Sequence, residues 1–116
     1  MSVMKSYAKR ECFDIGGTLL VINSKTENDY VLSRFQNENW ASFWLGINDK
    51  LNRNQWVIDS LYQRLESLTA PRYLNFHHKL NKPVRKAESA VFIKTGKWEK
   101  VSNAENHQFI CQKVLI

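Results

Sequence analysis

Apolar residues near the N-terminus recur at four-residue spacing. Met4, Ala8 and Cys12 fall on one side of a helix with about 3.6 residues per turn. The pair Gly16-Gly17 follows, and glycine is the usual residue just beyond a helix end. This pattern predicts a first helix that ends at the glycine pair.

The next segment changes from apolar to amphipathic. The run TLLVIN (18–23) predicts a short buried strand. Ser24 and Glu27 then have the spacing of a capping box, which predicts the start of a second helix. This helix is expected to run to about Gln36, and its apolar face consists of Val31, Leu32 and Phe35.

Beyond the second helix the chain reads as strands and loops. FWLGIN (43–48) and QWVID (55–59) are apolar or alternating, and the polar segment between them predicts a hairpin turn. Residues 60–88 lack a regular pattern apart from YLNF (73–76), so a long surface loop region is expected there. Such regions are where binding residues are commonly found.

The last part of the chain predicts further strands. SAVFIKTGKW (89–98) reads as a strand that turns at Thr95-Gly96 and returns through Trp98. QFICQKVLI (108–116) supplies the final strand. The predicted fold class is therefore α+β, with two helices followed by an antiparallel sheet interrupted by loops.

Length and composition favour one domain over residues 1–116. The chain has 43% apolar and 24% charged residues, with no apolar run of the length, about 18 residues, that a membrane span requires. The N-terminal MSVMKSYAKREC lacks the apolar core of a secretory signal. The chain is therefore either intracellular or preceded by an export segment that lies outside it.

The net charge of +6 favours encounters with polyanions. Much of this charge lies in one segment, before the acidic Glu88, and consists of His77, His78, Lys79, Lys82, Arg85 and Lys86. Runs of charge are usually solvated faces, so a solvated loop is preferred over a dedicated anion site. Glu88 is interpreted as a partner of Arg85 or Lys86.

The two cysteines, Cys12 and Cys111, lie near opposite ends of the chain. If paired, they would close a loop of roughly 100 residues and stabilise the fold by about 4–5 kcal/mol. Two buried free thiols, which are common in reducing compartments, are the alternative. The residues alone leave both open.

Seven short segments carry a resemblance to a known family. Their order and approximate spacing are similar to those of the C-type lectin-like domain: Cys12-x-x-x-Gly16-Gly17-x-Leu19, Glu27-Asn28-x-x-Val31, Phe43-Trp44-Leu45-Gly46-Ile47, Trp56-Val57-x-Asp59, Tyr73-x-Asn75-Phe76, Gly96-Lys97-Trp98 and Phe109-Ile110-Cys111. The resemblance covers nearly the whole chain.

This resemblance implies a compact domain with its ends close together, two flanking helices and a long loop that carries ligand contacts. It implies a disulfide between Cys12 and Cys111, and a secreted or extracellular location within a larger protein. The family's second disulfide is missing, because its positions correspond to Ala90 and Ala104. The family's first strand has little room before Met4, so the terminal strand pair is expected to be short or absent.

The resemblance also bears on metal binding. Sugar-binding members hold Ca²⁺ with a Glu-Pro-Asn or Gln-Pro-Asp tripeptide, a nearby Glu and an Asn-Asp pair after the tryptophan, and calcium requires several oxygen ligands. This chain has Lys82-Pro83-Val84 at the tripeptide and Glu99-Lys100 after Trp98, although Glu88 is retained. Lysines repel a cation. We therefore predict no calcium, no calcium-dependent sugar binding and no cofactor.

Other side chains are assigned to the fold. Five aromatic residues are predicted to be core residues, since aromatic side chains contribute large burial: Trp44, Trp56, Phe92, Trp98 and Phe109. His77 and His78 would face opposite sides of an extended segment, and His107 is distant, so a zinc site is not expected. No catalytic motif is present, so the chain is not expected to be an enzyme.

Three functions remain. The preferred one is a calcium-independent recognition module whose loop face binds a protein partner, with a charged rim of Lys82, Arg85, Lys86, Glu99 and Lys100. The first alternative is a binder of anionic, sulfated or sialylated glycans through the basic segment 77–86. The second is a structural subunit that forms a homodimer. Nucleic-acid binding would be non-specific at most.

Overall fold

The computed structural model describes residues 2–52, 55–59, 69–77 and 89–113. The elements are α1 (Lys5–Asp14), β1 (Gly17–Leu19), α2 (Lys25–Phe35), β2 (Ser42–Asn48), β3 (Val57–Ile58), β4 (Ser89–Ile93), β5 (Trp98–Val101), β6 (Gln108–Phe109) and β7 (Cys111–Lys113). The predicted α+β class is confirmed, and so are both helices and the two predicted hairpins. The predicted strand at 18–23 is shorter than expected, because only Gly17–Leu19 forms a strand.

The central sheet has the strand order β3-β2-β4-β5, and β1 pairs with β7 in a separate two-stranded sheet. Neighbours within the β3-β2-β4-β5 order are antiparallel, as predicted. The single final strand predicted over 108–116 is instead divided into β6, which pairs with the start of β2 in parallel, and β7, which pairs with β1. The reason is that residues 102–107 return the chain from the end of β5 to the beginning of β2.

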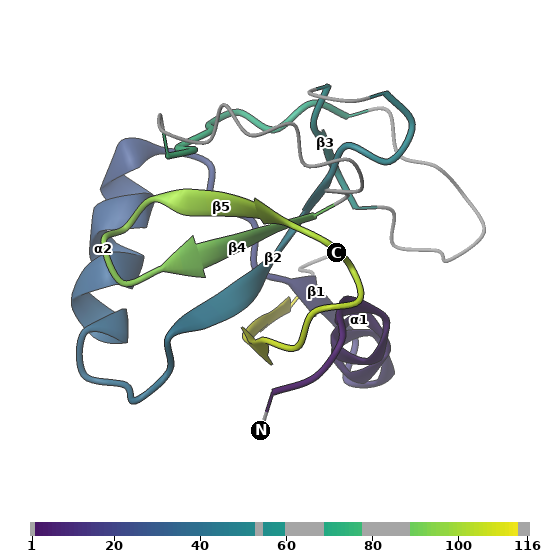
Figure 1. Cartoon of the computed structure of the whole chain (residues 1–116), viewed down its shortest axis with the longest axis horizontal. Helices are drawn as coiled ribbons and strands as arrows, with labels where there is room; N and C mark the ends of the chain where they lie inside the picture. The colour runs from purple at the N-terminus through teal and green to yellow at the C-terminus, as the bar shows by residue number, and fades with distance from the viewer. Residues whose placement is uncertain (1, 53–54, 60–68, 78–88, 114–116) are drawn as a thin grey trace.

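The two helices lie on opposite sides of the sheet (Figure 1). Alternate residues of β2 point to opposite faces, so Phe43 packs towards α2 while Trp44 packs towards α1. On the α2 side, Phe35, Phe43 and Phe92 form a ring cluster with centroid distances of 4.9 to 5.7 Å. This cluster forms the centre of the larger core.

The predicted core aromatics are confirmed with one exception. Trp44, Trp56, Phe92 and Trp98 are all at most 6% exposed. Phe109 is only half-buried, and it packs at the margin of the smaller cluster on the α1 side. The short strand β6 lies at the edge of the sheet, where a side chain has fewer neighbours.

The buried face of α1 differs by one position from the predicted face. Ala8 and Cys12 are buried as expected, but Met4 is 48% exposed and Lys5 is only 4% exposed. Met4 is the N-cap residue and has an extended backbone, so it lies outside the helical repeat. Lys5, Ala8 and Cys12 share one helical face through spacings of three and four residues.

The ends of the helices follow the sequence signals. Ser24 caps α2 by accepting a hydrogen bond from the Glu27 backbone N–H at 3.1 Å. Gly16, just beyond α1, has a φ of +81°, a conformation that side chains other than glycine rarely adopt. Both helix boundaries therefore have a local cause.

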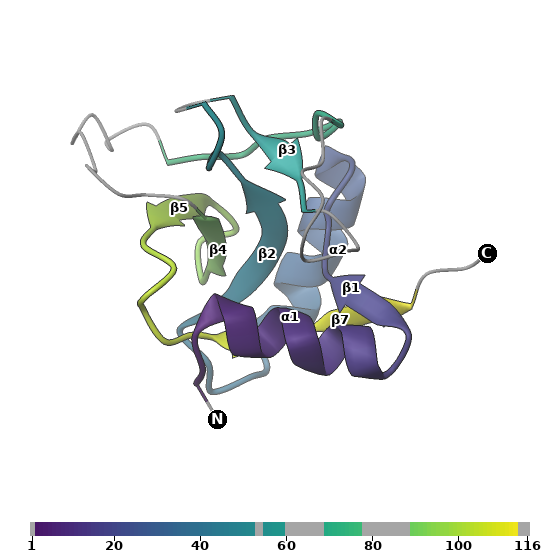
Figure 2. The same ribbon diagram turned by 90° about the vertical axis from the view of Figure 1, so that its right-hand side faces the viewer.

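The N-terminal segment contacts the C-terminal part of the chain. Val3 and His107 exchange two backbone hydrogen bonds of 2.9 Å each, and Trp44 Nε1 donates to Val3 O at 2.8 Å. The resemblance implied that the terminal strand pair is short or absent. In the structure it is reduced to a single antiparallel bridge between Val3 and His107. Figure 2 shows α1 and β7 next to one another on the same side of the molecule.

Gly46 lets β2 approach the segment after β1, and its replacement provides a test of this packing. The Gly46 N–H donates to Leu20 O at 2.8 Å, and an added Cβ would lie 2.8 Å from Leu19 O and 3.0 Å from Val21 Cγ2. We expect Gly46→Ala to lower the free energy of unfolding by about 1–3 kcal/mol through overpacking. Urea denaturation measures this change.

The matched control is Ser6→Ala, at an exposed position of α1. Exposed substitutions away from special features usually change stability by at most about 0.5 kcal/mol. Equal unfolding midpoints for the two variants would contradict a tight contact between β2 and the backbone at Leu19.

Candidate functional site

The predicted ligand-binding residues fall into two groups. His77, Glu99 and Lys100 belong to the described part of the chain. The others lie outside the described residues, as does Pro83: His78, Lys79, Lys82, Arg85, Lys86 and Glu88. Within the described residues, the candidate site therefore consists of β5 and the segment 69–77.

Residues 75–77 run along the outer edge of β5. The Trp98 N–H donates to Asn75 O at 2.9 Å, and the His77 N–H donates to Trp98 O at 3.0 Å. Phe76 and Trp98 form an isolated parallel bridge. This part of the predicted irregular region thus continues the hydrogen bonding of the sheet, which brings His77 next to β5.

Two lysines contact this segment from β5 and the turn before it. The Lys100 ammonium lies 5.6 Å from the centroid of the Phe76 ring, within range of a cation–π interaction. Lys97 Nζ donates to Asn75 Oδ1 at 3.1 Å, and Asn75 Nδ2 donates to Gly96 O at 2.8 Å. Lys97 was not among the predicted ligand-binding residues, although it lies in the quoted segment Gly96-Lys97-Trp98, directly before the tryptophan.

Glu99 and Lys100 project to opposite faces of β5. Lys100 is paired with Ala90, which belongs to the core cluster on the α2 side, and Glu99 is paired with Val91, which belongs to the cluster on the α1 side. Paired residues of neighbouring strands share a face. The two side chains therefore leave β5 in opposite directions, as the period of two along a strand implies.

A buried polar network lies on the α1 side of the sheet and was missed from the sequence. Lys5 Nζ donates to Ile47 O at 2.8 Å and to Ser89 Oγ at 3.0 Å, and it lies 3.1 Å and 3.2 Å from the two carboxylate oxygens of Asp59. Asn48 Nδ2 donates to Asp59 Oδ1 at 2.7 Å. The Lys5 ammonium is thus held by oxygen atoms from three strand ends.

The position of this network relates it to the predicted loop region. Asp59 directly precedes the segment 60–88 and Ser89 directly follows it. Because Lys5 contacts both residues, one ammonium joins the two flanks of this segment to α1. The Ile58 N–H also donates to Thr69 O at 2.8 Å. We refer to Lys5, Asn48, Asp59 and Ser89 as the Lys5 network.

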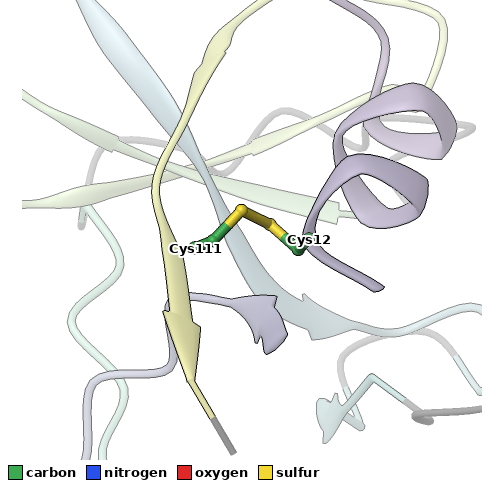
Figure 3. The surroundings of a disulfide bond; sticks show 2 residues. All are labelled: Cys12 and Cys111. Carbon is green, nitrogen blue, oxygen red and sulfur yellow. A yellow bond between two sulfur atoms is a disulfide. The ribbon is translucent and has the colours of Figure 1, made fainter. Parts of the chain in front are cut away.

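The structure contains the disulfide between Cys12 and Cys111 that the resemblance implied (Figure 3). It joins the buried face of α1 to β7, with the two Cα atoms 5.3 Å apart. The positions of the missing second disulfide differ in their surroundings, since Ala90 is fully buried and Ala104 is exposed. A hydrogen bond between Ser89 and Asn103 links the start of β4 to the turn after β5.

Two further properties concern the described residues alone. Within these ranges no three His, Cys, Asp or Glu side chains gather in a way that could hold a metal ion. Neither of the two helices described is long and apolar enough to span a bilayer.

Comparison with known proteins identifies relatives over almost the whole chain. A family model described as "Lectin C-type domain" matches residues 3–113. C-type lectin domain family 6 member A of Rattus norvegicus is 27% identical over 111 residues, which cover 92% of this chain and 49% of that protein. The chain thus spans about half the length of this curated relative.

Solved structures with the same fold include three that align with most of this chain. The mouse scavenger receptor C-type lectin carbohydrate-recognition domain is 21% identical, with a TM-score of 0.77 and coverage of 99% of this chain and 85% of that one. The C-type lectin CEL-I from Cucumaria echinata is 17% identical, with a TM-score of 0.79 and coverage of 96% and 83%. Human lithostathine is 18% identical, with a TM-score of 0.76 and coverage of 95% and 83%. At these identities the likeness concerns the fold.

Proposed function

This chain belongs to the C-type lectin domain family, and we propose that it acts as a calcium-independent recognition module that binds a protein partner. The proposed contact surface consists of β5 and residues 74–77, and we call it the β5 face. The segment 78–88, whose basic residues are predicted to bind the ligand, directly follows residue 77 in the chain. The proposal includes no catalytic step.

The observation that supports calcium independence is the lysine at position 100, in the pair that follows Trp98. In sugar-binding members an Asn-Asp pair follows the tryptophan and supplies oxygen ligands. Here Lys100 directs its ammonium over the Phe76 ring, and Glu99 lies on the other face of β5. A metal ion near Phe76 would meet a cation in place of an oxygen donor, and Coulomb repulsion disfavours that arrangement.

The composition of the β5 face favours a protein partner over a glycan. Leu74 is 47% exposed, and it lies beside the segment that Lys97 and Lys100 contact. Protein interfaces combine apolar side chains with a polar or charged rim.

The proposal is tested by binding of the fluorescently labelled domain to cells, with Lys100→Glu as the test variant. Arg10→Glu is the control, because it reverses a charge on the exposed side of α1, away from the β5 face. We expect wild-type binding to persist in a chelator and to disappear after protease treatment of the cells. Lys100→Glu should weaken binding by about tenfold or more, and Arg10→Glu should not.

Other outcomes of the binding experiment, together with a sedimentation measurement, distinguish the proposed function from the glycan-binding and homodimer functions. Loss of binding in the chelator would contradict calcium independence. Loss after enzymatic removal of sulfated or sialylated glycans, with a steep decrease on addition of salt, would instead support the anionic-glycan function. A molecular mass that rises with protein concentration in sedimentation experiments would support the homodimer function.

We also propose an extracellular location. The curated relative is about twice as long as this chain, so a role within a larger protein is part of this proposal. The Cys12–Cys111 disulfide supports it, because disulfides persist in oxidising compartments and are rare in the cytosol.

A further inference from the structure

We infer that the domain has a second binding site, in a pocket on the α1 side of the sheet, which takes a small amphipathic carboxylate. The pocket has a volume of about 230 Å³ and lies between α1, β1, β7 and the end of β3. Figure 2 shows α1, β1 and β7 grouped together below β3. This site does not depend on the proposed function of the β5 face, because no residue of that face lines the pocket.

The inner part of the pocket is apolar. Leu19 and Val21 line it and are 2% and 8% exposed, and Ile58 and Gly46 complete this surface. Phe13 also lines the pocket but is 55% exposed, which places an aromatic ring where the pocket meets solvent. Apolar walls and a partly exposed aromatic side chain suit the hydrocarbon part of a ligand.

The volume restricts the ligand to a small molecule. A dry cavity of about 150 Å³ accommodates benzene, and sites for drug-sized ligands begin near 300 Å³. The pocket, at about 230 Å³, lies between these sizes. A single ring or a short alkyl chain with one polar group is therefore the expected ligand.

The charged residues around the pocket favour a ligand whose polar group is anionic. Asp59 lines the pocket, but its carboxylate already pairs with Lys5 at 3.1 Å and accepts from Asn48 at 2.7 Å. Lys9 also lines the pocket, one helical turn after Lys5, and has no ionic partner among the residues described. Lys5, which does not line the pocket, already neutralises Asp59, so the Lys9 ammonium is the charge left uncompensated among the described residues around the pocket.

A neighbouring donor complements Lys9. Gln112 lines the pocket, and its Oε1 atom accepts a hydrogen bond from the Val21 N–H at 3.3 Å. Its amide NH₂ group is therefore left as a donor. A carboxylate that receives hydrogen bonds from an ammonium and an amide is bound more strongly than a neutral group of the same size.

The test is a titration of the ¹³C-methyl-labelled domain with hexanoate, hexan-1-ol and hexylamine, followed by NMR. We expect saturable shifts of the Leu19, Val21 and Ile58 methyl signals, with hexanoate bound about tenfold more tightly than hexylamine. Absence of saturable shifts at these methyl groups for all three probes, or a preference for the amine, would overturn the inference.

Two matched variants test whether Lys9 causes the preference for an anionic probe. Lys9→Gln should weaken hexanoate binding by about tenfold and leave hexan-1-ol binding unchanged. Arg10→Gln removes a positive charge from the next position of α1, which does not line the pocket, and should leave both unchanged. Equal effects of the two variants on hexanoate would show general charge attraction and would contradict a contact with Lys9.

A third variant tests whether the probes bind in this pocket. Thr18 lines the pocket from β1 and is half-exposed, so Thr18→Trp fills space without replacing a core residue. We expect this variant to lose binding of hexanoate and hexan-1-ol while it keeps the wild-type dispersion of amide signals. Wild-type affinity in a folded Thr18→Trp domain would place the probes elsewhere.

Discussion

Replacement of Lys5 by methionine is expected to lower the free energy of unfolding by about 3–5 kcal/mol. The Lys5 side chain is 5% exposed and the Asp59 side chain 9%, so the change leaves a buried carboxylate without its ammonium partner. Asn48 still donates to that carboxylate, but an amide does not neutralise its charge. Urea denaturation followed by tryptophan fluorescence measures the loss.

The control for this experiment is Lys25→Met. Lys25 and Asp29 form an ion pair on the exposed side of α2, with side-chain exposures of 79% and 56%. Exposed pairs contribute little because water screens them. Loss of Lys25 should therefore leave the unfolding midpoint nearly unchanged, and a midpoint shift as large as that of Lys5→Met would contradict the special role of burial.

A double-mutant cycle separates the ion pair from the packing of the lysine side chain. Asp59→Asn removes the charge of the partner and keeps a similar shape. The variant with both Lys5→Met and Asp59→Asn should be more stable than the sum of the two single effects predicts. Strict additivity would mean that Lys5 stabilises the fold through its alkyl chain and its bonds to Ile47 and Ser89.

The second large effect is expected from the disulfide. Cys12 and Cys111 are 99 residues apart, and the chain-entropy model assigns about 4.7 kcal/mol to a loop of about 100 residues. Small domains have a total stability of about 5–15 kcal/mol. Reduction of the wild-type protein, or Cys12→Ala with Cys111→Ala, should therefore remove a large fraction of the stability.

The measurement compares urea unfolding of both proteins with and without a reductant, while mass spectrometry of alkylated samples reports the state of the thiols. The alanine variant serves as the control, since its midpoint should not respond to the reductant. A wild-type midpoint that stays constant after complete, verified reduction would contradict the predicted contribution of the disulfide.

The parts of the fold that were predictable from the sequence have local causes. The Ser24–Glu27 spacing and the glycine after α1 depend on residues within one or two helical turns, and the structure confirms both boundaries. The strands around Trp44 and Phe92 follow from short apolar runs. Burial of these aromatic residues follows from their size and apolar character.

The features that were missed depend on distant parts of the chain. The Lys5 ammonium contacts Ile47, Asp59 and Ser89, which follow it by 42, 54 and 84 positions in the chain. Nothing near Lys5 in sequence distinguishes it from a solvated lysine. The parallel pairing of β6 with β2 likewise joins segments more than 60 residues apart. Periodicity reports local geometry, whereas these contacts are decided by the packing of the whole domain.

The candidate site shows the same division. The opposite orientations of Glu99 and Lys100 were predictable from the alternation along a strand, although both were assigned to one charged rim. The contact of Lys100 with Phe76 was not predictable, because it requires residues 75–77 to lie along β5. The roles of Lys82, Arg85 and Lys86 stay predictions.

The Lys5 network has a consequence for how such a domain can evolve or be engineered. Lys5 fixes Asp59 and Ser89, so the positions at which the segment 60–88 leaves and rejoins the core are set by α1 and the sheet. Lengthening a surface segment between fixed ends carries only a small entropic penalty. Insertions between residues 59 and 69, or between residues 77 and 89, are therefore expected to leave the fold in place, provided that Lys5, Asp59, Ser89 and the packed segment 69–77 are kept.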